Sequence, residues 1–132
     1  MLATAKRPIT AILFIFISQI AHAETILSEE EVLSLISGNT VQGIHLGPNI
    51  PFESYFSPDG SALQKRGDQR LEGEWFVDKQ GRHCVKWEDK ARKCRVVVRD
   101  QDEYREYTIN TKTGKREYTL IINKLIEGRP NE

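Results

Sequence analysis

The 132-residue sequence lacks an excess of either charge, because 19 lysines and arginines stand against 19 aspartates and glutamates. Two of the basic residues, Lys6 and Arg7, and none of the acidic ones lie in the first 23 residues. Residues 24–132 therefore carry 17 basic against 19 acidic side chains, a net charge of −2. A protein that binds nucleic acid mainly through phosphate contacts needs a clear basic excess. We expect no nucleic-acid partner.

The sequence also lacks a long apolar run. Ile9–Ile20 spans only twelve residues and is interrupted by Ser18 and Gln19, whereas a membrane-spanning helix needs about 20. A basic pair precedes this run and Ala21-His22-Ala23 follows it, which is the layout of a secretory signal peptide. We expect cleavage near Ala23-Glu24 to remove residues 1–23. This predicts an exported protein with no membrane span after cleavage.

Cysteine and histidine are scarce. After the leader, the chain contains Cys84, Cys94, His45 and His83, which make a poor ligand set for zinc. In an exported protein, two cysteines at this spacing are expected to form a disulfide. Closing this short loop stabilises a domain by roughly 2.8 kcal/mol in the chain-entropy description. We therefore expect a disulfide, no metal and no cofactor.

A nucleophile motif is missing as well, since the chain contains no Gly-x-Ser-x-Gly sequence. Glu72 and Glu74 share one face of a predicted strand, and with His83 or His45 they could form the acid–base pair of a small hydrolase or isomerase. Because Arg70 lies on the same face, a solvated outer surface is the better interpretation. We expect no catalytic residues and no enzyme.

One helix is predicted, over Leu27–Gly38. Ser28 is a good N-cap, Glu31 completes a capping box, and Leu27 can pack against Val32. Gly38 supplies the stop signal. We expect this helix to pack on the rest of the domain through one apolar stripe.

The remainder of the chain predicts about eight strands joined by short turns. They lie at 39–45, 51–57, 62–66, 70–77, 83–87, 94–98, 103–109 and 115–123. Strands at this regular spacing favour an antiparallel meander, closed as a small barrel or folded as a sandwich. We expect one mainly β domain with one N-terminal helix over residues 24–126, followed by a loose tail over 127–132.

Two patterns conflict in the hairpin that carries the cysteines. A register whose paired numbers sum to 178 places Cys84 opposite Cys94, as a cross-strand disulfide requires. A sum of 179 keeps the valines of the two strands on one face but separates the cysteines. We expect the disulfide register, an irregularity such as a β-bulge near Glu88–Arg92, and a core that contains Trp75, Val85, Trp87, Val96 and Val98.

Basic residues gather on the second strand of this hairpin. Lys93, Arg95 and Arg99 fall on one strand face, which we expect to point outward. Such a row could bind an anionic glycan, a lipid head group or an acidic protein patch. A solvated row paired with nearby acids is the more common arrangement. The row is nevertheless the best candidate for a partner-binding site.

The order of short motifs is distinctive. LSEEEVLSLISGNTVQG, PFESYFSPDG, LEGEWFVD, GRHCVKW and KCRVVVRD follow one another between Leu27 and about Tyr107. This order resembles a family of small exported bacterial proteins catalogued only as a domain of unknown function. The resemblance implies periplasmic export and a lipocalin-like β fold, and it implies no activity.

Three functions are compatible with these features. The leading hypothesis is non-catalytic binding of a protein partner or small ligand in the cell envelope. A structural envelope protein without a specific ligand and the small hydrolase or isomerase are the alternatives.

Overall fold

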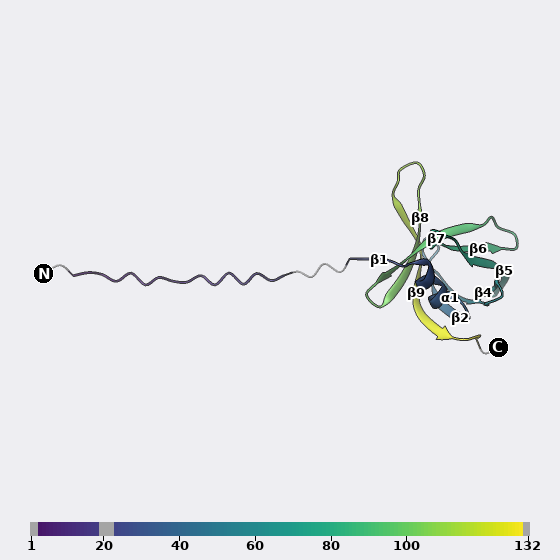
Figure 1. Ribbon diagram of the computed structural model, residues 1–132, viewed down its shortest axis with the longest axis horizontal. Coiled ribbons are helices and arrows are strands. Elements are labelled where there is room, and N and C mark those ends of the chain that lie inside the picture. The colour runs from purple at the N-terminus through teal and green to yellow at the C-terminus, as the bar shows by residue number, and fades with distance from the viewer. Residues whose placement is uncertain (1–2, 19–22, 131–132) are drawn as a thin grey trace.

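The computed structural model describes residues 3–18 and 23–130. Residues 3–18 form neither helix nor strand and run away from the folded domain (Figure 1). Their large apolar side chains are exposed, Ile9 to 94% and Phe16 to 90%. Most of the predicted cleavage motif, Ala21-His22, lies outside the described residues. Within the described ranges, no helix is long and apolar enough to cross a membrane.

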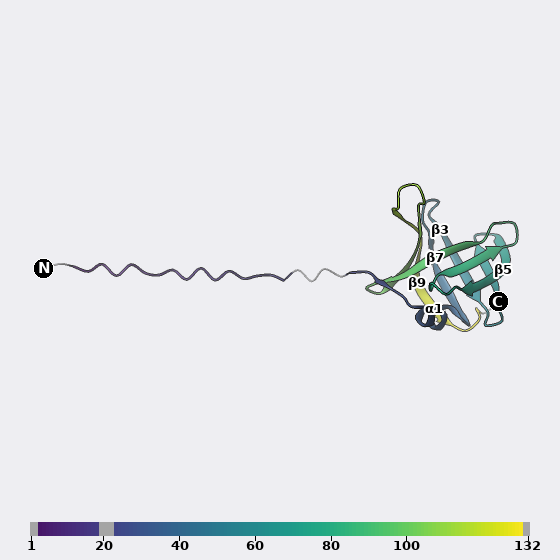
Figure 2. The same cartoon turned by 45° about the horizontal axis from the view of Figure 1, so that its top comes forward.

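The domain is a closed antiparallel barrel of eight strands (Figures 1 and 2). Each strand pairs with the next along the chain, and the last strand pairs back onto the first. The prediction of an eight-stranded barrel is confirmed, and the alternative of an open sandwich is wrong. The strands are β2 (Asn39–His45), β3 (Ile50–Phe56), β4 (Ser61–Arg66), β5 (Gln69–Val77), β6 (His83–Trp87), β7 (Lys93–Asp100), β8 (Glu103–Ile109) and β9 (Arg116–Glu127).

The helix α1 (Glu29–Ile36) lies against one end of the barrel, where β2 begins (Figure 2). The predicted capping box is present, with Glu31 N–H donating to Ser28 Oγ at 3.2 Å and Ser28 N–H donating to Glu31 Oε1 at 3.1 Å. Val32 and Ile36 are fully buried in the core. The helix therefore closes this end with apolar side chains.

The apolar core lies inside the barrel and includes residues of α1. Trp75 and Val85 belong to it as predicted, and Trp87 packs against it while partly exposed. On β7, however, the core residue is Val97 and not Val96 or Val98. Val98 is fully buried, but alternation along the strand places it on the opposite side from Val97.

The cysteine register is the one that the disulfide requires. Cys84 is paired directly with Cys94, and the two form a disulfide. The predicted β-bulge is absent, because the β6–β7 pairing ends at Val85 and Lys93 without a register shift and residues 88–92 form a loop. No bulge is needed, since β7 turns Val97 inward in place of its two valine neighbours. Register shifts occur instead beside Gly43 on β2 and between Glu106 and Tyr107 on β8.

A short strand that the sequence analysis missed completes the wall. β1 (Thr25–Ile26) pairs with β7 at Arg99 and Val98, beyond the point where β6 and β7 are paired. Two residues are too few to show an alternating pattern. The strand extends the sheet beside the seam between β6 and β7.

The C-terminal tail is held at its start. Strand β9 continues to Glu127, four residues beyond the predicted end, and Gly128 N–H donates to the Gly38 carbonyl at 3.1 Å. The Thr40 hydroxyl donates to the Gly128 carbonyl at 2.7 Å. The tail predicted to be loose from 127 is therefore bound to β2 and the end of α1 at its first residues. Residues 131–132 lie outside the described part.

Candidate functional site

A cavity of about 120 Å³ opens at the end of the barrel opposite α1. Its walls come from the last residues of β2, β4 and β6, the first residues of β7 and the β6–β7 loop. The meander brings these chain ends together because alternate turns of an antiparallel barrel lie at the same end. We call this site the cationic mouth, and it is lined by His45, Arg66, Lys90, Lys93 and Arg95 together with Val85, Trp87 and Ala91.

Two of the three residues predicted to form an outward basic row belong to the cationic mouth. Lys93 pairs with Val85 and Arg95 pairs with His83, so both share the inner face of β6 and β7. The prediction that they point outward is wrong. The register that joins the cysteines on the outer face requires their neighbours to be inside.

The third member of the row, Arg99, lies at the other end of the barrel. It lines a separate surface groove beside α1 together with Glu30 and Tyr104, and its side chain is exposed. The predicted row is therefore not one surface. The cationic mouth contains residues that the sequence analysis did not connect with it, notably Arg66 and Lys90.

The basic groups of the cationic mouth lack acidic partners. No acidic residue occurs among the described residues that line the cavity. One Nη of Arg66 donates to Gln64 Oε1 at 3.1 Å, but the Nε atoms of Arg66 and Arg95 are buried without a hydrogen-bond partner. Lys90 and Lys93 are exposed at the rim. The site combines two half-buried guanidinium groups with two solvated ammonium groups.

His45 adds an uncharged imidazole to the lining of the cationic mouth. Burial, followed by the charge of Arg66, lowers its pKa from 6.5 to about 4, and Arg95 acts in the same direction. Its ring packs on Phe52 with a centroid distance of 4.6 Å. The Nε2 atom is buried without a hydrogen-bond partner. At neutral pH the ring is therefore neutral and its Nε2 is unused.

A buried polar pair lies deeper in the barrel. His83 Nδ1 is 3.2 Å from Glu106 Oε1, and both side chains are 3% exposed. Phe56 and Trp75 pack edge-on against the His83 ring. Glu106 is the only acidic residue that is buried in the described part of the chain. It is paired with His83 and does not line the cationic mouth.

The acid–base pairs considered from the sequence are not formed. Glu72 and Glu74 are exposed, and they lie on the opposite side of β5 from the core residue Trp75. His45 and His83 are on the inside of the barrel. The pair that does form, His83 with Glu106, is packed between aromatic rings and does not line the cavity. Its members are 23 residues apart, and no local sequence pattern connects them.

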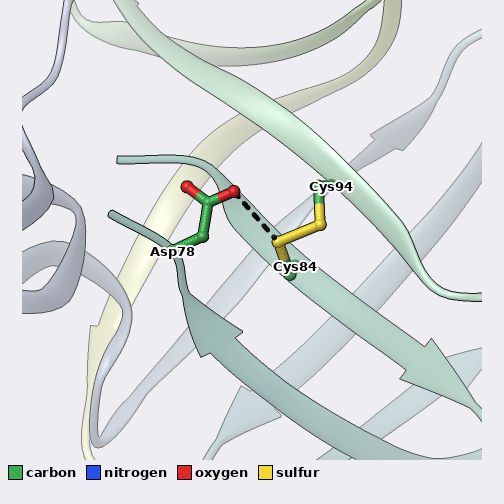
Figure 3. A group of neighbouring side chains, drawn as sticks. All are labelled: Asp78, Cys84 and Cys94. Atoms are coloured by element: carbon green, nitrogen blue, oxygen red, sulfur yellow. Dashed lines mark hydrogen bonds between the residues drawn. A yellow bond between two sulfur atoms is a disulfide. The ribbon is translucent and has the colours of Figure 1, made fainter. Parts of the chain in front are cut away.

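Asp78 lies beside the disulfide on the outside of the barrel (Figure 3). Its Oδ2 atom is 3.8 Å from Cys84 Sγ and also accepts a hydrogen bond of 2.8 Å from Arg82 Nε. The carboxylate and both sulfur atoms lie within 4.8 Å of one another, a spacing compatible with metal ligands. Because the sulfur atoms are bonded to each other, they are not thiolate ligands. We interpret the disulfide as a covalent link between β6 and β7, with the Asp78 carboxylate beside it.

A scan against models of protein families finds no match, and a search of curated proteins finds no similar sequence. The resemblance to a family of small exported proteins stays a prediction. The candidate site therefore depends on the geometry of the barrel alone.

The shifted pKa of His45 predicts how stability depends on pH. Below pH 6.5 the unfolded chain binds a proton on His45, whereas the folded barrel binds it only near pH 4. Stability is therefore complete above pH 6.5 and decreases as the pH falls toward 4. From pH 7 to pH 5 we expect the wild type to lose about 1 kcal/mol more than His45→Gln, after allowance for solvent screening. Urea unfolding at both pH values measures this, and equal losses in the two proteins would contradict it.

Proposed function

We propose that this protein is an exported, non-catalytic binding barrel whose cationic mouth holds the anionic group of a small ligand. The observation that carries the proposal is the lining of the cavity, with Arg66 and Arg95 half-buried and no acidic residue beside them. Small barrels of eight strands have room for one small ligand at most. A ligand bound at the rim of such a barrel needs no opening of the core.

The electrostatics of the cationic mouth favour a ligand over a purely structural role. Like charges in a partly desolvated cavity repel one another and reduce the stability of the fold. Charged groups that serve only to hold a barrel together are normally paired, as Arg82 is with Asp78 on the outside. Guanidinium groups with free Nε–H donors are also the usual protein partners of carboxylates and phosphates. A bound anion would remove the repulsion and use these donors.

Export is supported by two features of the chain. The apolar leader has the layout of a signal peptide and is exposed beside the folded domain. The disulfide is of the kind that forms and persists in oxidising compartments. Both features suit a binding protein of the bacterial periplasm or cell surface, where envelope maintenance or inhibition of a foreign enzyme are possible roles.

Thermal unfolding with added anions tests the proposal. At fixed ionic strength, sulfate in large excess over its dissociation constant should raise the melting temperature of the wild type by about 4 °C or more. Arg66→Gln/Arg95→Gln should lose this increase because it removes both half-buried cations.

The matched control is Lys112→Gln/Lys115→Gln, which removes the same charge from the exposed β8–β9 loop. This control should respond to sulfate as the wild type does. If sulfate raises the melting temperatures of both double variants equally, binding is a general surface effect and the proposal is wrong.

A further inference from the structure

We propose that the group held in the cationic mouth is a tetrahedral dianion, namely a phosphate that is either free or carried as a monoester on a small molecule. The inference rests on the proposed function and specifies the chemistry of its ligand. Three properties of the cavity carry it: its charge, the directions of its donors and its size.

The less solvated part of the cavity carries two positive charges, which match a ligand with two negative charges. Arg66 and Arg95 are half-buried, whereas Lys90 and Lys93 stand in solvent at the rim. Water screens the two ammonium groups more effectively than the two guanidinium groups. Glu106 is held by His83 and does not line the cavity. A single carboxylate would leave one guanidinium uncompensated, whereas a dianion neutralises both.

The donors of the cationic mouth come from several walls. His45 ends β2, Arg66 ends β4, Arg95 is on β7, and Lys90 belongs to the β6–β7 loop. In the closed strand order, two strands separate β4 from β7, and two others separate β7 from β2. A carboxylate accepts hydrogen bonds from donors near one plane, whereas the oxygens of a phosphate point in tetrahedral directions. Donors arranged around a ring therefore suit phosphate better.

The size of the cavity limits the enclosed group. A volume of about 120 Å³ corresponds to about four water molecules at their liquid volume. This space suits a phosphate group but leaves no room for a sugar or aromatic ring beside it. The rest of a monoester must extend past the rim, where Trp87 offers an apolar wall. Trp87 is partly exposed and can contact such an extension.

Isothermal titration calorimetry at constant ionic strength tests the inference on the wild-type protein itself. The second pKa of a phosphate monoester is about 6, so at pH 5 only about a tenth of glycerol 3-phosphate is dianionic. We expect its affinity to rise by about 10-fold from pH 5 to pH 7.5. Sulfate, which is dianionic at both pH values, should bind with similar affinity at each. Acetate should bind at least ~10-fold more weakly than sulfate, because it carries half the charge.

The variants show where these anions bind. Arg66→Gln/Arg95→Gln should lower the affinities for sulfate and glycerol 3-phosphate by at least ~10-fold. Lys112→Gln/Lys115→Gln should leave both affinities unchanged. The affinity for inorganic phosphate distinguishes a free phosphate from one carried on a small molecule. Equal affinity for inorganic phosphate and the monoester indicates free phosphate, and tighter binding of the monoester indicates a carried group. Either result supports a tetrahedral dianion.

Two results would overturn the inference, and they differ in what they leave standing. If acetate binds as tightly as sulfate through the same two arginines, or if the affinity for glycerol 3-phosphate is the same at pH 5 and pH 7.5, the ligand is not selected as a tetrahedral dianion. The proposal of an anion-binding mouth survives that result. If no anion binds saturably, both the inference and the proposed function are wrong.

Discussion

Replacing His83 by leucine is expected to lower the free energy of unfolding by about 3–5 kcal/mol. The substitution leaves the Glu106 carboxylate buried without its partner, since both side chains are 3% exposed in the wild type. Breaking a buried polar pair by removing one partner is strongly destabilising, because the remaining group has neither solvent nor a partner. Urea unfolding at pH 7 measures the loss.

Two further variants separate this explanation from a general packing defect. His83→Leu/Glu106→Leu removes both polar groups, and we expect it to recover most of the stability lost in the single variant. Glu103→Gln breaks the partly exposed pair between Glu103 and Arg105 and should cost less than about 1 kcal/mol. A double variant no more stable than His83→Leu would show that packing, and not the unpaired Glu106 side chain, accounts for the loss.

Removing the disulfide with Cys84→Ala/Cys94→Ala is expected to cost about 2–4 kcal/mol. The bond closes the pair of strands whose mutual pairing covers only three residues on each, from His83 to Val85 and from Lys93 to Arg95. Two of those residues, Lys93 and Arg95, line the cationic mouth. We therefore expect the variant to bind sulfate more weakly as well as to unfold more easily.

Reduction provides the control for this prediction. Dithiothreitol should destabilise the wild type by a similar amount and should not change Cys84→Ala/Cys94→Ala. Melting temperatures with and without the reductant measure both effects. A wild type that is insensitive to complete reduction, verified by thiol titration, would contradict a stabilising role for the bond.

The strand order of the barrel could be predicted because the signals for it are local. Ser28 and Glu31 identify the start of the helix, and the turn residues between strands identify most strand ends to within one or two residues. These signals depend on a few neighbouring side chains, and no distant contact overrides them here. The end of β9 was missed because residues 124–127 pair with β2, which the local sequence does not indicate.

The inward direction of the basic residues on β7 could not be read from hydrophobicity. Val96, Val97 and Val98 are consecutive, so alternation does not show which of them faces the core. The disulfide settles the matter, because opposing Cys84 and Cys94 also opposes His83 and Arg95. The core predicted from the sequence combined the disulfide register with the valine pattern of the other register, and these two are incompatible.

The cationic mouth itself forms only when strands that are distant in the sequence close into a barrel. Arg66 and Arg95 line one cavity only because eight strands close into a barrel that places the ends of β4 and β6 beside the start of β7. The same is true of His83 and Glu106, which lie on β6 and β8 with β7 between them. A pattern confined to one strand cannot show a contact across the barrel interior.

Arg66 and Arg95 are proposed to bind one anion together, and NMR of the arginine side chains can follow each of them separately. Sulfate should shift the Nε–H resonances of Arg66 and Arg95 along one saturable curve with a common dissociation constant. The Nε–H of Arg82, which is already paired with Asp78 on the outside of the barrel, should not follow that curve. Shifts of Arg66 and Arg95 that are linear in sulfate concentration, or no larger than that of Arg82, would contradict the claim.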